Sequence, residues 1–600
     1  MLLLGCIFCL TVSQLRSYYY LHFLFAVGFS SALCIAGKLI CNNSGGKTNV
    51  FYFCVVVSIL LVMFPMMVNG FFYGDDLWGY ATDIPPELRN ISGSIALRRP
   101  INGIINAMFL PVSFDSSWIH RALNVIILAI SSCVIFTYIH NVRKNVWIAL
   151  AITVLFSCST VMIDSVAYLS VSSVFYSLLA SVAAYIEFEK AYNEKKRWSY
   201  AVGGLLLVMA FMLYQITTPI VFFMFMISIY EKREKDFDHF KKAFTLLIWY
   251  GIIALLYLLF SNGIMRMYGV DATQTERAQF VSSLPVIISK VKWFIGTVVP
   301  QTCYKIVSNI FGYSSYTTNN LFYEVQFVND ALGTITLLVI LRLSSVYFLR
   351  FILQKRFFSL FIGLCAVVLT FYPFLILPES YSLSYYMVPI VALFIYYTIE
   401  GGGIIYRQVT KLLHRRIHID TRKISLCMSC VIACIYIVHG ASYASNWVNY
   451  CRDSHIYIRQ YLSSTLTEKT EKICVSGRIS PYVGGNPYVI FSTQLALKEL
   501  GYDPNDYQVM QIDNPYYITE MPASSMEKAK ALLSTEDYAH LNQYYIYDGM
   551  YNRYLYNYSA DQDGKRFIQR CLIDCDLILL ENNETNIYFS LAGFTNTHPF

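Results

Sequence analysis

The hydrophobic pattern of this chain is a succession of apolar runs, most of them roughly twenty residues long, separated by short polar loops. A helical run of this length crosses the hydrocarbon core of a bilayer. Membrane-spanning helices are therefore predicted at residues 18–37, 50–68, 119–140, 146–163, 166–188, 199–215, 217–231, 243–261, 330–349, 357–377, 383–399 and 424–443. There are twelve such spans, or thirteen if the apolar residues 2–12 also insert. The pattern predicts a polytopic α-helical membrane protein.

The distribution of lysine and arginine predicts how these spans are oriented. One set of alternate loops carries 22 Lys and Arg residues, whereas the opposite loops are longer in total and carry about nine. Because basic residues are retained on the cytoplasmic side, the first set is assigned to the cytoplasm. Basic loops on both sides of residues 198–231 make that stretch a hairpin of two short spans that turns near Gln215. The loops 69–118 and 262–329 then face the outside.

Both long outer loops contain segments that are apolar on one side. Residues 101–110 have Asn102 and Asn106 four positions apart, and residues 284–299 are apolar but include two lysines. Helices with such faces lie in the membrane interface rather than crossing it. We expect two interfacial helices on the outer side.

From Ala444 onwards the composition becomes polar, with alternating runs typical of strands. Strands are predicted at 472–476, 507–512 and 577–580, and helices at 449–466 and 525–533. The sequence thus predicts three parts. These are residues 1–49 with one or two extra spans, 50–443 as the transmembrane module, and 444–600 as a small extracytoplasmic α/β domain.

Composition supports a membrane protein and excludes other classes. The chain is 56% hydrophobic and only 14% charged, and its mean hydropathy is +0.47. The net charge of +7 follows from the basic cytoplasmic loops, so no nucleic-acid partner is predicted. Most of the 16 cysteines lie in or beside the spans, where they act as small buried hydrophobic residues. Their spacing does not indicate zinc, and the disulfide connectivity of the tail cannot be assigned.

The first outer loop contains two adjacent carboxylates, Asp75 and Asp76, directly after a predicted span. Aromatic residues flank them, including Tyr73 and Trp78. Neighbouring carboxylates have split pKa values, and a carboxylate at the lipid boundary suits a general base. The alternative is an ordinary helix cap.

Cations form a second group of candidates. Arg98 and Arg99 follow in the same loop, Arg121 lies just inside a span, and Lys290 and Lys292 belong to the later interfacial segment. Arginine suits bidentate phosphate contacts, and a charge inside a span needs a partner. The alternative is contact with lipid headgroups.

A third group lies in short outer turns. Asp164 is predicted in a tight turn between two spans, and Glu379 precedes the tyrosines Tyr381, Tyr385 and Tyr386. Tyrosines beside a carboxylate suit sugar recognition, through stacking and hydrogen bonds to hydroxyl groups. The two carboxylates are otherwise helix caps.

These motifs and the topology resemble the GT-C superfamily of membrane glycosyltransferases. Segment 73–78 (YGDDLW), followed by Arg99 and Pro100, resembles the serotype-converting glucosyltransferases of bacterial O-antigens, the Gtr type. The resemblance in topology covers residues 50–443 plus an outer tail, and the sharp motif covers some thirty residues.

The resemblance implies transfer of a hexose, typically glucose in this family, from a polyprenyl-phosphate donor to a lipid-linked O-antigen glycan. Asp76 or Asp75 would be the general base, and Arg98, Arg99 and the lysines would hold the leaving lipid phosphate. The reaction would invert the anomeric centre on the periplasmic face of the bacterial inner membrane. No cofactor is predicted, and the aspartate pair alone does not establish a divalent metal ion.

Two other functions remain as alternatives. An O-antigen polymerase or ligase shares the compartment but relies on arginine-rich outer loops. A transporter or flippase of lipid-linked sugars tends to have internal repeats and ionisable residues near mid-membrane. Here no repeat is visible, and the ionisable groups gather at the outer edge.

Overall fold

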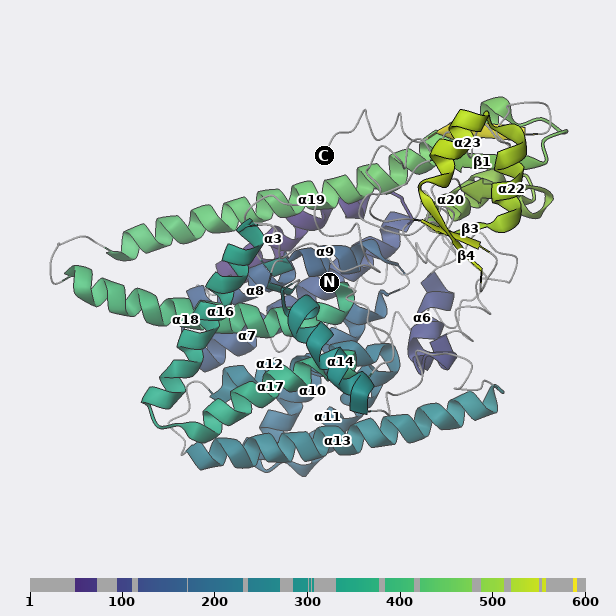
Figure 1. Cartoon of the computed structure of the whole chain (residues 1–600). Helices are drawn as coiled ribbons and strands as arrows, with labels where there is room; N and C mark the ends of the chain where they lie inside the picture. The colour runs from purple at the N-terminus through teal and green to yellow at the C-terminus, as the bar shows by residue number, and fades with distance from the viewer. Residues whose placement is uncertain are drawn as a thin grey trace. The chain divides into compact units, whose positions relative to one another are not determined.

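The fold is taken from a computed structural model of the chain (Figure 1). It describes residues 49–72, 94–109, 117–169, 171–229, 236–269, 284–300, 302–303, 305–306, 331–376, 384–414, 421–476, 487–511, 520–549, 553–556 and 586–590. The chain divides into two units. The first consists of residues 1–70, 84–316 and 322–447, and the second consists of residues 71–83, 317–321 and 448–600.

The described part of the first unit is helical. Its long helices are α3 (Asn49–Val68), α7 (Ser117–Arg143), α10 (Ser173–Glu194), α11 (Arg197–Tyr214), α13 (Asp236–Met267), α16 (Ala331–Leu353), α17 (Phe357–Ile376), α18 (Val388–His414) and α19 (Thr421–Thr465). Shorter elements are α6 (Pro100–Phe109), α8 (Val146–Ser157), α9 (Thr160–Ala167), η2 (Gln215–Thr217), α12 (Ile220–Ile229), α14 (Leu284–Trp293), the π-helical turn η5 (Phe294–Val298) and the 3-10 turn η7 (Ser384–Met387). A helix is present at each predicted span from residue 50 onwards, and the 18–37 prediction lies outside the described residues.

The described helices are those of a membrane protein. Five of them are long and apolar enough to cross a bilayer, and the bent pair α8 and α9 would make a sixth. Two shorter apolar helices cover Ile220–Ile229 and Phe357–Tyr372. Leucine and phenylalanine side chains remain exposed along α13, as expected of a surface that faces lipid. The total of twelve or thirteen spans remains a prediction.

One predicted boundary is wrong. Residues 160–167 form a separate helix, α9, bent by 43° from α8, and α10 begins only at Ser173. Asp164 therefore lies inside a helix that ends at Ala167, and not in a turn. Ser159 lies in the break, and its hydroxyl donates to the carbonyl of Phe156 (2.8 Å). A serine whose hydroxyl bonds to a nearby backbone carbonyl can occupy a helix break without a glycine or proline. Hydropathy therefore does not reveal this break.

Contacts within the first unit sort the helix ends into two groups. At one end, the start of α13 caps the start of α17, because Asp236 accepts hydrogen bonds from the backbone N–H groups of Phe358 (2.8 Å) and Ser359 (3.0 Å). At the other end, Asn262 near the end of α13 contacts the segment before α6. Helices that alternate in direction produce this arrangement. The membrane side that each end faces remains a prediction.

The second unit combines two small sheets with helices. Strands β1 (Lys472–Ser476), β2 (Gln508–Gln511) and β6 (Asn586–Ser590) form a parallel sheet in the order β2-β1-β6. Strands β3 (Glu520–Pro522), β4 (Tyr545–Asp548) and β5 (Arg553–Tyr556) form an antiparallel sheet in the order β3-β5-β4. The helices and turns are α20 (Pro487–Glu499), η8 (Pro504–Asp506), α22 (Ala523–Leu532) and α23 (Thr535–Asn542). The strands predicted at 472–476 and 507–512 and the helix at 525–533 are present, and 577–580 lies outside the described residues.

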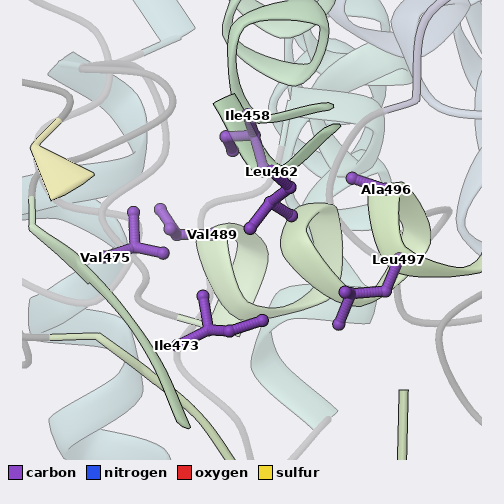
Figure 2. Packing of buried hydrophobic residues seen from close by; sticks show 7 residues of the cluster. All are labelled: Ile458, Leu462, Ile473, Val475, Val489, Ala496 and Leu497. Carbon is purple, nitrogen blue, oxygen red and sulfur yellow. The ribbon is translucent and has the colours of Figure 1, made fainter. Parts of the chain in front are cut away.

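The second unit has its own hydrophobic core. Figure 2 shows side chains of β1, α20 and the last turns of α19 packed together. The cluster consists of Ile458, Leu462, Ile473, Val475, Val489, Ala496 and Leu497, all at most 1% exposed. The helix predicted at 449–466 is thus the end of the longer helix α19.

Candidate functional site

The segment that leads into α6 is a tight turn centred on Arg98. The N–H of Arg98 donates to the carbonyl of Ile95 (2.8 Å), and the N–H of Arg99 donates to that of Ser94 (2.7 Å). Arg98 has a φ of +61°, in the left-handed region. The turn is followed by Pro100, a residue well suited to the first position of a helix. A left-handed conformation costs a non-glycine residue about 1–2 kcal/mol, so other contacts must hold the turn.

Those contacts come from Gln215 and Tyr257. The Gln215 side-chain nitrogen donates to the carbonyl of Leu97 (2.9 Å) and to the Tyr257 hydroxyl (2.7 Å). The Tyr257 hydroxyl in turn donates to the carbonyl of Arg98 (2.8 Å). Two residues from η2 and α13 thus bind the backbone on each side of the strained position.

The guanidinium of Arg99 is fixed from two sides. Its Nε donates to Gln215 Oε1 (2.6 Å), and its Cζ lies 4.0 Å from the ring centre of Tyr214. Neither terminal nitrogen of Arg99 donates a hydrogen bond to the described part of the chain. Burial alone would lower the pKa of Arg99, but the electrostatic effect of nearby tyrosines, Tyr214 foremost, raises it above its ordinary value. The side chain is a cation whose terminal N–H groups are not used by any group among the described residues.

Arg98 is also oriented by a neutral group. Its Nη1 donates to Asn262 Oδ1 (2.7 Å), and its Nε is buried with no hydrogen bond among the described residues. The Tyr257 hydroxyl is bound to the backbone carbonyl of Arg98 and to Gln215, which in turn orients Arg99. Two adjacent cations are therefore held around one tyrosine by neutral acceptors.

Tyrosines surround this pair of arginines. Tyr385 and Tyr386 are both 6% exposed, and their ring centres are 4.9 Å apart. The ring of Tyr385 also contacts those of Tyr214 and Tyr168, each at 5.8 Å and nearly perpendicular. An aromatic cluster thus links η7 to the Arg99 side chain. Of the three tyrosines predicted together, Tyr381 lies outside the described residues.

Arg121 has an internal role. It is fully buried and donates from Nε (3.2 Å) and Nη2 (3.0 Å) to the carbonyl of Ala167, and from Nη1 to the Ser117 hydroxyl (3.2 Å). Ala167 is the last residue of α9, and the carbonyl groups at a helix end have no N–H donor within the helix. Arg121 therefore caps a helix. The prediction that it contacts substrate gains no support from this geometry.

Asp164 is likewise occupied within the protein. Its Oδ2 lies 3.1 Å from Lys305 Nζ, and its Oδ1 accepts hydrogen bonds from Tyr443 (2.8 Å) and Trp447 (3.2 Å). The carboxylate is only 3% exposed. It ties α9 to α19 and to the segment around Lys305, so the prediction of a substrate contact in a turn does not fit its place inside a helix.

Of the remaining predicted site residues, the structure describes only Lys290 and Lys292. Lys290 on α14 is 3% exposed and lies 5.9 Å from the ring of Trp293, whereas Lys292 is exposed. The other predicted site residues, Tyr73, Asp75, Asp76, Trp78 and Glu379, lie outside the described residues. Within the described residues, no group of three or more His, Cys, Asp or Glu side chains could hold a metal ion.

Sequence reasoning missed the residues that orient the arginines. Gln215 was identified only as the turn of a hairpin, Tyr257 only as part of a span, and Asn262 only as the start of an outer loop. A usable signal was present, because a glutamine in a turn between two apolar helices and a tyrosine among leucines both need hydrogen-bond partners.

Comparison with protein-family models and with curated proteins finds no match for this chain.

Proposed function

We propose that this protein is a membrane glycosyltransferase that takes a hexose from a polyprenyl-phosphate donor. The observation that carries the proposal is the pair Arg98 and Arg99, which is oriented by Asn262, Gln215 and the Tyr214 ring instead of by carboxylates. Neutral acceptors fix the geometry of a guanidinium and leave its charge available. A phosphate group is the ligand that matches such donors.

The tyrosine cluster supports a sugar attached to that phosphate. Aromatic rings stack on the C–H faces of sugars, and phenol groups hydrogen-bond to their hydroxyl groups. Tyr214 connects the arginines with the tyrosine cluster, because its ring lies against the Arg99 guanidinium and contacts the ring of Tyr385. A donor with a phosphate and an adjoining hexose fits this combination better than either part alone.

In the proposed reaction, Asp76 or Asp75 takes the proton from an acceptor hydroxyl. The hydroxyl oxygen forms a bond to the anomeric carbon as the bond between that carbon and the phosphate oxygen breaks. The electron pair leaves with the polyprenyl phosphate, whose growing negative charge Arg98 and Arg99 stabilise. Attack from the opposite face inverts the anomeric centre. The acceptor is proposed to be a sugar of a lipid-linked surface glycan on the periplasmic face.

The test is transfer of radiolabelled glucose from undecaprenyl-phosphate glucose to lipid-linked O-antigen in membranes. Wild type, Asp75→Asn and Asp76→Asn are compared at matched expression, with Asp83→Asn from the same loop as the control. Loss of a general base lowers the rate by about 10²–10⁴-fold, so one of the two variants is expected to lose transfer. Wild-type activity in both Asp75→Asn and Asp76→Asn would contradict the assignment of the base. If wild type transfers neither glucose nor another hexose, the proposed activity is wrong.

A further inference from the structure

We infer that Gln215 and Tyr257 are the positioning residues that preorganise Arg98 and Arg99 for the phosphate of a polyprenyl-phosphate lipid. This inference rests on the proposed function for its substrate class. It assigns a role to two residues that do not themselves touch the sugar, and its evidence is the hydrogen-bond pattern around the turn.

Gln215 uses both ends of its amide on the same short segment. Its oxygen accepts from Arg99 Nε (2.6 Å), and its nitrogen donates to the carbonyl of Leu97 (2.9 Å). The Gln215 side chain therefore fixes both the backbone that precedes Arg98 and the guanidinium of Arg99, which follows it. No residue with only a donor or only an acceptor could replace it.

Tyr257 completes the arrangement from α13. Its hydroxyl accepts from Gln215 (2.7 Å) and donates to the carbonyl of Arg98 (2.8 Å), and its ring stacks on Phe211 with centres 5.0 Å apart. The ring contact locks the hydroxyl in place. The left-handed backbone at Arg98 is thereby retained, and the two arginine side chains leave the chain in fixed directions.

The consequence is a site that does not reorganise when it binds an anion. The Nε of Arg99 is engaged with Gln215, while its two terminal nitrogens donate to no described group. Gln215 thus sets the plane of the guanidinium without consuming the donors that a phosphate needs. Preorganised donors of this kind bind more tightly because less side-chain freedom is lost on binding.

The first test is binding of undecaprenyl phosphate by the purified full-length protein in detergent. Gln215→Ala and Tyr257→Phe are compared with wild type, and uncharged undecaprenol serves as a second probe for each. Gln215→Ala is expected to weaken undecaprenyl phosphate binding about tenfold, the effect of losing a hydrogen bond to a charged group. Tyr257→Phe is expected to have a smaller effect in the same direction. Undecaprenol binding is expected to stay at the wild-type value.

The matched control is Thr218→Val, in the same turn. The Thr218 hydroxyl contacts Tyr250 (2.6 Å) and the carbonyl of Gln215, but neither arginine. Its affinity for undecaprenyl phosphate is expected to equal that of wild type. A Gln215→Ala variant that binds both probes equally weakly, or the phosphate probe as tightly as wild type, would overturn the inference.

A second readout separates this inference from the proposed function. In the transfer assay, Gln215→Ala is expected to raise KM for the donor far more than it lowers kcat. If wild type transfers no sugar while phosphate binding still depends on Gln215, the proposed activity fails and the inferred phosphate site stands. If transfer occurs and KM is unchanged in Gln215→Ala, the inference fails and the activity stands.

Discussion

The helical unit holds its cations in two different ways. At one end, Arg143 pairs with Glu400, and Lys242 lies 2.7 Å from Glu189. At the other end, the described side-chain partners of Arg98 and Arg99 are the amides of Asn262 and Gln215 and the ring of Tyr214. A carboxylate partner neutralises a cation, and a neutral partner only orients it. The first arrangement holds helices together, and the second leaves charge for a ligand.

The largest effect is expected on the free energy of unfolding, when the pair of Arg143 and Glu400 is broken. Arg143→Ala breaks the buried ion pair with Glu400, and breaking such a pair from one side destabilises a protein by about 3–5 kcal/mol. The midpoint of thermal unfolding in detergent is expected to fall accordingly. The double variant Arg143→Met and Glu400→Leu removes both charges and is expected to recover most of the loss. A double variant no more stable than Arg143→Ala would contradict the explanation that the loss of stability comes from the buried charge of Glu400.

A smaller effect is expected when a carboxylate is introduced at the other end. Gln215→Glu places a negative charge where Arg99 now has a neutral acceptor. Binding of undecaprenyl phosphate is expected to weaken about tenfold, or about 1.4 kcal/mol, because the new carboxylate competes with the phosphate. Thermal stability is expected to fall, because a carboxylate cannot replace the hydrogen bond that the Gln215 side-chain nitrogen donates to the carbonyl of Leu97. Unchanged affinity would mean that the charge of Arg99 does not contribute to binding.

The smallest effect concerns a charged cluster in the second unit. Burial alone would raise the pKa of Glu499, but its hydrogen bond with His455 and the nearby Arg459 more than offset this, and the pKa is lowered. A carboxylate with a lowered pKa stabilises the fold above its unfolded pKa, and this contribution is lost as pH falls through the lower folded value.

Hydrogen exchange of α20 in the full-length protein measures this effect. After correction for intrinsic rates, protection is expected to fall between about pH 5 and pH 3 in wild type. In Glu499→Gln, protection is expected to be lower at pH 6 and flat below it. Identical pH profiles would contradict a role for this carboxylate in stability.

The sequence predicted the positions of the described helices because apolar length is a strong signal. It also predicted β1 and α22 from local pattern. It did not predict the break at Ser159, because a local side-chain hydrogen bond leaves no mark on the hydropathy pattern. It did not predict the burial of Asp164, because that depends on partners more than a hundred residues away, such as Lys305 and Tyr443. The sequence identified Arg98 and Arg99 as candidates from charge alone. That neutral partners orient them became apparent only when η2 and α13 were brought beside the turn.

The most direct measurement is the affinity of the purified protein for undecaprenyl phosphate when both arginines are replaced. The variant Arg98→Gln with Arg99→Gln is compared with Arg266→Gln, which removes an exposed cation from the last turn of α13. The account predicts binding about a hundredfold weaker in the double variant, from the loss of two charge-assisted contacts, and wild-type affinity in Arg266→Gln. Equal affinity in all three proteins would contradict the claim that this arginine pair holds a lipid phosphate.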